Sequence, residues 1–190
     1  MAVIYVIRHG KTRLNVDSVI IGWKNVSLTN EGIKSARRIS LILKDKNIRA
    51  IVTSDLKRAM ETARIIGKQL KIADIRVIPE LKEINYGKLE GRKKSEIRRT
   101  IPEYHTNVDF RNPGGESLKD LEKRVVKVIK ILCAKDKIPL LVTHAGCMRV
   151  IYSYFRKQPL KKNILMKIGH ETIFRCSKKG SKRMLRIIHE

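Results

Sequence analysis

The sequence predicts an α/β fold, a three-layer αβα sandwich around a mainly parallel central sheet. Short apolar runs of strand length alternate along the 190 residues with longer segments of helical periodicity. The first apolar run does not alternate with polar residues, which is typical of a strand buried on both faces of a parallel sheet. The chain contains no linker, internal repeat or low-complexity segment, so we expect one domain over residues 1–190.

The first expected strand is the run AVIYVI, and Arg8, His9 and Gly10 follow it directly. Open α/β sheets bind their ligands at the carboxyl ends of the strands, so these residues are expected at the mouth of a site. After a loop, Thr29 is a good N-cap for the first long helix. One face of this helix carries apolar or small side chains, namely Ile33, Ala36, Ser40 and Leu43.

The next strand and helix repeat the pattern. The short run RAIVTS predicts a buried strand, and Ser54 and Asp55 after it are expected N-caps of the helix over 56–70. The expected apolar side of that helix carries Leu56, Ala59, Met60, Ala63 and Ile66. A third strand follows in IRVIPEL and is closed by Pro79.

Residues 82–116 are the least regular part, with one short helix expected in KKSEIRRTI, and we expect this insertion to select the substrate. The segment PGGES then provides a turn and Ser117 as the cap of a long helix. The apolar positions of that helix are Leu118, Leu121, Val125, Val128 and Leu132. A strand in IPLLVT ends at His144, a helix continues in CMRVIYSYF, and residues 171–190 predict two strands joined by a glycine-containing hairpin.

Composition limits the class of protein. No run approaches the roughly 20 apolar residues of a membrane-spanning helix, and the N-terminus lacks a signal-peptide pattern. The three cysteines, Cys133, Cys147 and Cys176, form no CxxC motif and no cluster with histidine. We therefore expect a cytoplasmic protein without structural zinc. Whether it is a monomer or a homodimer is left open by the sequence.

Charge points to an anionic partner. Lys and Arg number 43 against 18 Asp and Glu, a formal net charge of +25, and the excess is largest from Arg156 to the C-terminus. Such a charge steers anionic substrates toward a protein, and it is also common in nucleic-acid-binding modules. Aromatic residues are only 5%, and no basic and aromatic stacking pattern appears, so nucleic acid is the secondary hypothesis. A solvated lysine-rich surface explains the charge equally simply.

Two expected strands end in histidine, in VIRHG and LVTHAG. If these strands are neighbours, His9 and His144 meet at one edge of the sheet, close to Arg8, Arg58 and Asn15. Guanidinium groups match phosphate oxygens, and the helix N-termini after Ser54 and at Gly146 add backbone N–H donors. Each residue also has an ordinary structural explanation, but their convergence at strand ends favours a pocket for a phosphate dianion.

These motifs resemble those of the histidine phosphatase superfamily, which includes the cofactor-dependent phosphoglycerate mutases. The resemblance runs through RHGKTRLN, GWKNVSLTNEG, SDLKRAMETA, EINYGKLEG, PGGES and VTHAG, and it covers nearly the whole chain. It implies the phosphoglycerate mutase-like form of the αβα fold. It also implies that His9 is the nucleophile, that Glu83 is the proton donor, and that the phosphoryl group is bound by Arg8, Asn15, Arg58, His144 and Gly146.

The segment EINYGKLEGRKKSE is close to the version found in mutases, and the resemblance implies that Tyr86 and Lys94, with Gly22, contact the substrate. Ile84 and Asn85 stand where mutases carry Arg and His. Lys11, Leu14, Ile21 and Asn25 also depart from common family residues, in loops that affect substrate fit.

The function we expect is a metal-independent phosphatase that hydrolyses small anionic phosphomonoesters through a phosphohistidine. Its cationic charge would come from Arg8, Arg58 and a protonated His144, so no metal and no other cofactor is expected. The alternative within the family is a phosphoglycerate mutase primed by 2,3-bisphosphoglycerate. A basic nucleic-acid-binding module is the alternative from another class, and its affinity would fall steeply with salt.

Overall fold

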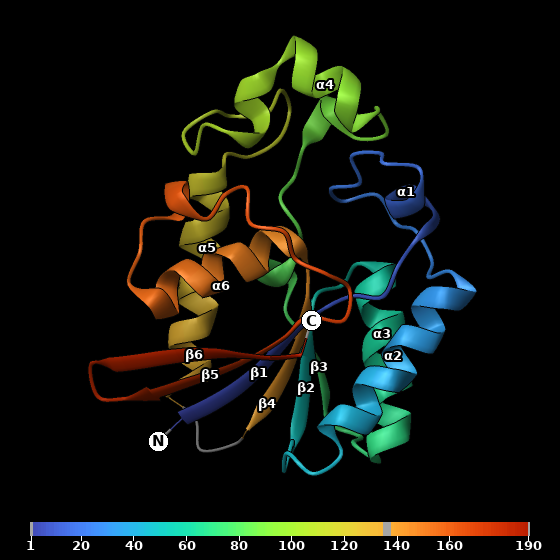
Figure 1. Cartoon of the computed structure of the whole chain (residues 1–190), viewed down its shortest axis with the longest axis vertical. Coiled ribbons are helices and arrows are strands. Elements are labelled where there is room, and N and C mark those ends of the chain that lie inside the picture. The colour runs from blue at the N-terminus through green and yellow to red at the C-terminus, as the bar shows by residue number, and fades with distance from the viewer. Residues whose placement is uncertain (1, 135–137, 190) are drawn as a thin grey trace.

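Six strands form one sheet in the order β3-β2-β4-β1-β5-β6 (Figure 1). The computed structural model describes residues 2–134 and 138–189. Strands β1 to β4 run parallel, whereas β5 and β6 are antiparallel to their neighbours. The strands are β1 (Ala2–Arg8), β2 (Ala50–Thr53), β3 (Ile75–Val77), β4 (Pro139–Thr143), β5 (Ile173–Lys179) and β6 (Lys182–His189). The α/β fold with a mainly parallel sheet is confirmed.

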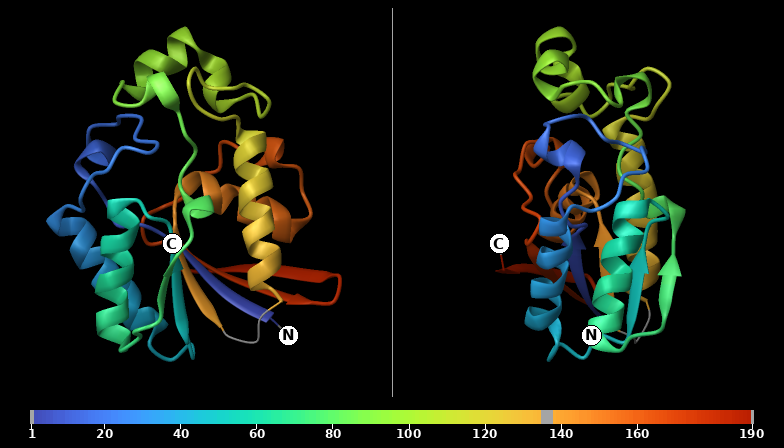
Figure 2. Two further views of the ribbon diagram at one scale, coloured as in Figure 1. Left: turned by 180° about the vertical axis from the view of Figure 1, so that it is seen from behind. Right: turned by 90° about the vertical axis from the view of Figure 1, so that its right-hand side faces the viewer.

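Helices cover both faces of this sheet, and β1 shows why (Figure 2). Side chains alternate across a strand, so Val3, Tyr5 and Ile7 pack with α2 (Asn30–Leu43) and α3 (Lys57–Leu70). Ile4 and Val6 belong to the opposite core, with α5 (Leu118–Leu132) and α6 (Ala145–Arg156). Burial on both faces explains the continuous apolar run in the sequence.

Besides the three layers of the sandwich, a smaller group of elements lies beyond the carboxyl ends of the parallel strands. It contains α1 (Arg13–Val16) and α4 (Lys94–Thr100), which Figure 1 shows together at one end of the molecule. Its own small core comprises Ile20, Leu89, Ile97 and Tyr104. The irregular character of 82–116 is confirmed: besides α4, it contains 3₁₀ helices at Gly87–Leu89 and Pro102–His105. Further 3₁₀ helices are Pro79–Leu81 and Leu160–Lys162.

The caps show where the sequence prediction held and where it was wrong. Thr29 and Ser117 accept hydrogen bonds from backbone N–H groups at the starts of α2 and α5, as predicted. The predicted caps of α3 are wrong, because Leu56 is the N-cap of this helix and makes no side-chain cap hydrogen bond. Ser54 instead contacts His144, and Asp55 pairs with Lys82.

Some helix details also differ from the prediction. On the predicted apolar faces, Ile33 and Met60 are only half-buried. The last predicted helix begins at Ala145, two residues earlier than expected, directly after His144. The four-residue α1 was not predicted, since one turn has no periodicity to detect. The C-terminal hairpin is present as β5 and β6, and Glu190 lies outside the described residues.

Two glycines fix the loop after β1 against the start of α2. A Cβ at Gly10 would lie 2.5 Å from the carbonyl oxygen of Gly32, and one at Gly32 would lie 2.3 Å from that of Lys11. Only residues without a side chain permit this approach of two backbones.

The change Gly32→Ala should therefore lower the free energy of unfolding by about 1–3 kcal/mol, because the clash outweighs the better helix propensity of alanine. Urea unfolding measures the effect. Lys34→Ala, at an exposed position of the same helix, is the control. A Gly32→Ala protein as stable as this control would contradict the packing argument.

Candidate active site

Parallel pairing of β1 and β4 brings the two predicted histidines together. Arg8 lies opposite Thr143 in the ladder, so His9 and His144 leave the sheet side by side. Their ring centroids are 5.1 Å apart, and both side chains are buried. The prediction that these strands are neighbours is confirmed.

His9 is held at both ring nitrogens. Its Nδ1 lies 2.8 Å from the carbonyl oxygen of Gly10, and Nε of Arg58 donates to its Nε2 at 3.1 Å. A carbonyl oxygen only accepts and a guanidinium only donates, so both contacts select the same tautomer. Nδ1 carries the proton, and Nε2 presents its lone pair.

The surroundings keep this imidazole neutral. Burial lowers the pKa of His9 well below its ordinary value, and its interactions with Arg58, His144 and Arg8 act in the same direction. A neutral ring with an unprotonated nitrogen is the nucleophilic form of histidine. Here the hydrogen bond from Arg58 occupies the lone pair of Nε2, so this donor must turn to a phosphoryl oxygen before Nε2 can attack.

Arg58 lies in the first turn of α3 and is 1% exposed. Besides His9, its guanidinium donates to the carbonyl oxygens of Lys24 at 2.9 Å and Gly22 at 2.8 Å. Burial lowers its pKa to about 10, so the group remains cationic at neutral pH. Arg58 thus ties the loop around Gly22 to His9 and adds a buried positive charge beside it.

His144 is the N-cap of α6, and its Nε2 is hydrogen-bonded to the hydroxyl of Ser54 at 2.8 Å. Its buried Nδ1 has no partner among the described residues. Burial, followed by Arg58 and Arg8, lowers its pKa well below the ordinary value. The neutral ring is therefore favoured in this arrangement, and the protonated His144 expected during phosphoryl transfer stays a prediction.

Arg8 ends β1 close to both histidines. Its Nη1 donates to the carbonyl oxygen of Ile168 at 2.8 Å, and its buried Nε is without a partner in the described structure. Burial lowers the pKa of Arg8 to about 10, which still leaves it cationic.

A cavity of about 170 Å³ opens beside His9. Of the predicted site residues, the cavity is lined by His9, Asn15, Gly22, Arg58, Glu83, Tyr86 and Lys94. Arg8, His144 and Gly146 lie outside this lining as far as the structure describes it. The strand-end cluster and the irregular segment 82–116 thus meet at one cavity.

Glu83 is fixed by the start of α6. Its carboxylate accepts from the backbone N–H of Ile84 at 3.0 Å and from that of Gly146 at 3.1 and 3.2 Å. A Cβ at Gly146 would lie 2.3 Å from Oε1 of Glu83, so glycine is needed for this approach. We expected the Gly146 amide to bind phosphate. Here it holds a carboxylate, since helix N-termini attract either anion.

The remaining predicted residues differ in their surroundings. Oδ1 of Asn15 accepts from the backbone N–H of Thr12 at 3.1 Å and from its hydroxyl at 2.9 Å, which leaves the amide NH₂ as the donor for a ligand. Burial lowers the pKa of Lys94, followed by the charges of Arg8 and Arg98. Burial also raises the pKa of Tyr86.

Several residues of the site were not predicted. Arg98 and Arg149 line the cavity, together with Tyr104 and His105. The spacing along the helices could have indicated the two arginines, because residues four apart lie on the same face of a helix. Arg98 follows Lys94 by four residues, and Arg149 follows Ala145 by four. His170 was also missed: its Nδ1 lies 2.8 Å from the carbonyl oxygen of His9, and their rings are 5.6 Å apart. Nothing in its local sequence marks it.

Neither a metal-binding cluster nor a membrane-spanning helix occurs among the described residues. No group of three or more His, Cys, Asp or Glu side chains among them is arranged to hold a metal ion. Within the same residues, no helix has the length and apolarity needed to cross a membrane.

Comparison with known proteins gives one consistent result. The sequence profile described as Histidine phosphatase superfamily (branch 1) matches residues 4–186. The chain is 30% identical over 189 residues to a 2,3-bisphosphoglycerate-dependent phosphoglycerate mutase of Parvibaculum lavamentivorans, covering 92% of this chain and 90% of the relative.

Solved structures agree with this result. Bacillus stearothermophilus YhfR is similar with a TM-score of 0.89 and 26% identity, over 99% of this chain and 96% of that one. A mycobacterial glucosyl-3-phosphoglycerate phosphatase in complex with VO3 shares the fold with a TM-score of 0.88 and 24% identity, over 98% of each chain.

The buried histidines should make stability depend on pH. Burial, followed by the charge of Arg8, lowers the pKa of His170 to about 4. As the pH falls below about 6.5, the unfolded chain binds a proton at His170 that the folded protein does not bind. Stability is therefore complete above this pH and is lost toward pH 4, by up to about 1.4 kcal/mol per pH unit for this group.

His170→Asn should make the slope of unfolding free energy against pH shallower by that amount, as measured by urea unfolding between about pH 7 and 5. Parallel slopes for the two proteins would show that His170 does not titrate as its burial requires.

Proposed function

The chain belongs to branch 1 of the histidine phosphatase superfamily, and from this premise we propose a metal-independent phosphatase that hydrolyses small phosphomonoesters through a phosphohistidine at His9. The observation that carries the proposal is the pair of hydrogen bonds that fixes the ring of His9. Because Gly10 holds Nδ1 and Arg58 donates to Nε2, the lone pair of the nucleophile lies beside the cation that would bind the phosphoryl oxygens.

Orphaned donors at the site support a dianionic ligand. Nε of Arg8 and Nδ1 of His144 are buried without partners within the described residues, and such groups cost about 1–3 kcal/mol each. Phosphoryl oxygens would accept from Nε of Arg8 and, where Nδ1 of His144 carries a proton, from that nitrogen too, and the amide NH₂ of Asn15 would add another donor. A bound dianion would also raise the pKa of His144 and make the imidazolium the favoured form. No metal is needed to supply this charge.

The chemistry then follows in two steps. Nε2 of His9 attacks phosphorus, the bond from phosphorus to the ester oxygen breaks, and a protonated Glu83 gives its proton to the leaving oxygen. In the second step a water molecule gives a proton to the Glu83 carboxylate and attacks the phosphohistidine. The bond from phosphorus to nitrogen breaks, which releases phosphate and restores the neutral imidazole. Arg8, Arg58 and His144 stabilise the charge on the equatorial oxygens in both steps.

Residues 82–116 are the part of the chain that we assign to substrate selection. They contribute Glu83 together with Tyr86, Lys94, Arg98, Tyr104 and His105 to the cavity lining. The cavity of about 170 Å³ suits a small substrate. Because small phosphorylated metabolites are found inside cells, we place the enzyme in the cytoplasm.

A phosphatase agrees better with the structure than a mutase does. Ile84 stands where mutases carry an arginine, and its side chain is fully buried in the core. Asn85, at the position of the mutase histidine, accepts a hydrogen bond from the backbone of Gly87 at 2.9 Å.

Mutase activity is nevertheless the second candidate, because Tyr86 and Lys94 line the cavity and a relative carries that name. Incubation with 3-phosphoglycerate, with and without 2,3-bisphosphoglycerate, separates the two candidates by ³¹P NMR. The phosphatase releases inorganic phosphate, whereas a mutase forms 2-phosphoglycerate and depends on the bisphosphate primer.

His9→Ala should abolish turnover and leave the fold intact, because this residue lies at the end of a strand. A phosphorylated substrate, supplied with EDTA present, should give the wild-type protein an acid-labile, base-stable phosphate, located at His9 by mass spectrometry. Circular dichroism checks that the variant is folded. Turnover by the folded variant would contradict the mechanism, and a need for added metal would contradict the assigned source of charge.

Glu83→Gln should slow esters with poor alkoxide leaving groups by about 10²-fold or more, because the variant lacks the proton that the leaving oxygen needs. It should spare p-nitrophenyl phosphate, since nitrophenolate leaves with little help. Single-turnover phosphorylation of His9 isolates this step from the later hydrolysis. Equal losses for the two esters would remove Glu83 from the acid role and make the neighbouring Glu90 the next residue to test.

A further inference from the structure

We propose that Arg124, paired with Glu116, is a positioning residue that sets the place of Glu83 and thereby controls proton transfer to the leaving group. The inference rests on the proposed function. Among the described residues, neither Arg124 nor Glu116 lines the cavity. Both would therefore act through the backbone that carries Glu83.

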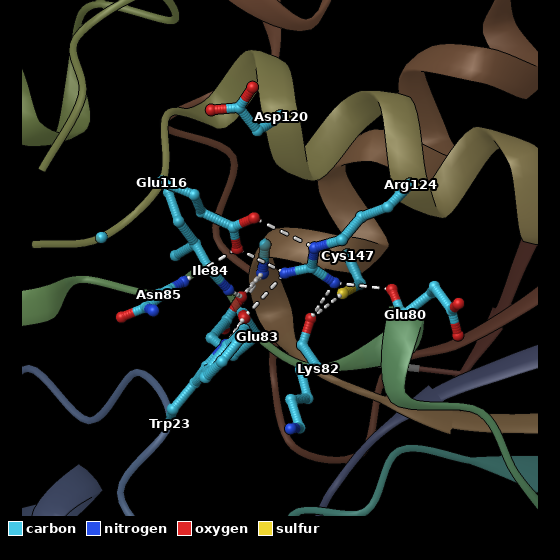
Figure 3. A network of polar contacts seen from close by, with 12 residues as sticks. Trp23, Glu80, Lys82, Glu83, Ile84, Asn85, Glu116, Asp120, Arg124 and Cys147 are labelled. Carbon is cyan, nitrogen blue, oxygen red and sulfur yellow. Dashed lines mark hydrogen bonds and ion pairs between the residues drawn. The ribbon is translucent and has the colours of Figure 1, made fainter.

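Arg124 lies on α5, and its guanidinium binds both that backbone and the side chain of Glu116 (Figure 3). Nη1 donates to the carbonyl oxygens of Glu80 at 2.6 Å and Lys82 at 2.7 Å, and Nη2 donates to that of Glu83 at 2.9 Å. Nε and Nη2 form a bidentate pair with the carboxylate of Glu116 at 3.1 and 2.5 Å. A guanidinium has five N–H donors, and these contacts use all of them.

The segment that Arg124 binds has no strand to hold it. Between the 3₁₀ helix Pro79–Leu81 and the next one at Gly87–Leu89, residues 82–86 belong to no helix or strand. Carbonyl groups in such a segment need partners from elsewhere. Here one planar cation supplies donors to two carbonyl groups of this segment, those of Lys82 and Glu83, and to that of Glu80 in the preceding 3₁₀ helix, which fixes their relative orientation as well as their position.

Glu116 extends the same contact past Glu83. Its Oε1 accepts from the backbone N–H of Asn85 at 2.9 Å, and its own N–H donates to the carbonyl oxygen of Asn85 at 3.0 Å. The Arg124–Glu116 pair therefore holds the chain on both sides of Glu83. This assigns a task to the glutamate of PGGES, which neither the cap at Ser117 nor the proposed catalytic groups explain.

Two further contacts restrict the position of Glu83. The carbonyl oxygen of Glu83 accepts a second bond, from Nε1 of Trp23 at 2.7 Å, while its carboxylate is held by Gly146. Side chain and main chain of Glu83 are thus anchored on different elements. Loss of the Arg124 contacts would leave Trp23 as the remaining described partner of the Glu83 carbonyl group, and this weaker main-chain anchor would let the carboxyl move relative to the ester oxygen. A displacement of about 1 Å costs on the order of 10²-fold in rate.

Arg124→Lys tests the inference, since lysine keeps the charge but cannot bridge three carbonyl groups and a carboxylate. Single-turnover phosphorylation of His9 is measured with an alkyl phosphate and with p-nitrophenyl phosphate, beside the wild type and Glu83→Gln. We expect the alkyl ester to slow by about 10²-fold and the nitrophenyl ester by less than about threefold. Inhibition by vanadate should stay the same, because His9, Arg8 and Arg58 are untouched.

The matched control is Arg111→Lys. Arg111 also pairs with a carboxylate and a carbonyl group at the PGGES turn, namely Asp120 at 2.8 Å and Gly115 at 3.2 Å, but its contacts do not extend to 80–85 in the described chain. Both ester rates should be unchanged in this variant. Glu116→Gln weakens the contacts of this side chain with Arg124 and with the backbone of Asn85. It should also slow the alkyl ester more than the nitrophenyl ester, but by a smaller factor than Arg124→Lys does.

The ratio of the two ester rates decides the outcome, because it does not depend on the fraction of folded protein. Equal losses for both esters in Arg124→Lys and Glu116→Gln, or a matching loss of vanadate inhibition, would show a merely structural role and overturn the inference. If Glu83→Gln shows the selective loss and Arg124→Lys does not, only the inference fails. If the wild type forms no phosphohistidine, the proposed function fails first.

Discussion

The hydrogen bond from Nε of Arg58 to Nε2 of His9 is the interaction on which the rest of the site depends. It fixes the tautomer of the nucleophile, places a buried cation beside it, and ties the loop around Gly22 to the end of β1. Burying a guanidinium is costly unless it is paired, and among the described residues its partners are two carbonyl groups and an imidazole. None of these hydrogen-bond partners is a carboxylate, so among its described contacts the guanidinium carries a positive charge without a directly bonded counterion, which suits a binding site for a dianion.

The structure holds the His9 cluster and the proposed proton donor Glu83 in different ways. The proposed nucleophile His9, with Arg8 and His144, comes from strand ends, where the sheet itself sets the distances, and Arg58 comes from the first turn of α3. Glu83 comes from a segment without regular structure, so the start of α6 and side chains of α5 must hold it. Evolution can alter such a segment without disturbing the sheet, and the substrate-facing residues of 82–116 lie in the same part of the chain. A shared nucleophilic core with a variable substrate side fits the variety of names among the similar proteins.

The sequence was informative wherever a regular period or a strand end determined position. The sequence placed His9 and His144 at strand ends, where they meet once β1 and β4 pair, and the caps Thr29 and Ser117 followed from local chemistry. The sequence could not show that Ser54 bonds to His144 or that Gly146 serves Glu83, because these contacts join segments 90 and 63 residues apart. His170 and the Arg124 contacts were missed for the same reason: irregular backbone brings them together, and irregular backbone has no pattern to read.

The central claim is that His9 is a neutral imidazole with its proton on Nδ1 and its lone pair on Nε2. Nitrogen-15 NMR of the histidine-labelled protein tests this most directly, with His9 assigned by comparison with His9→Ala. Near pH 7 the Nε2 resonance should have the shift of an unprotonated ring nitrogen, and Nδ1 that of a protonated one. A proton on Nε2, in either the other tautomer or the imidazolium, would contradict the donation from Arg58 and remove the basis of the mechanism.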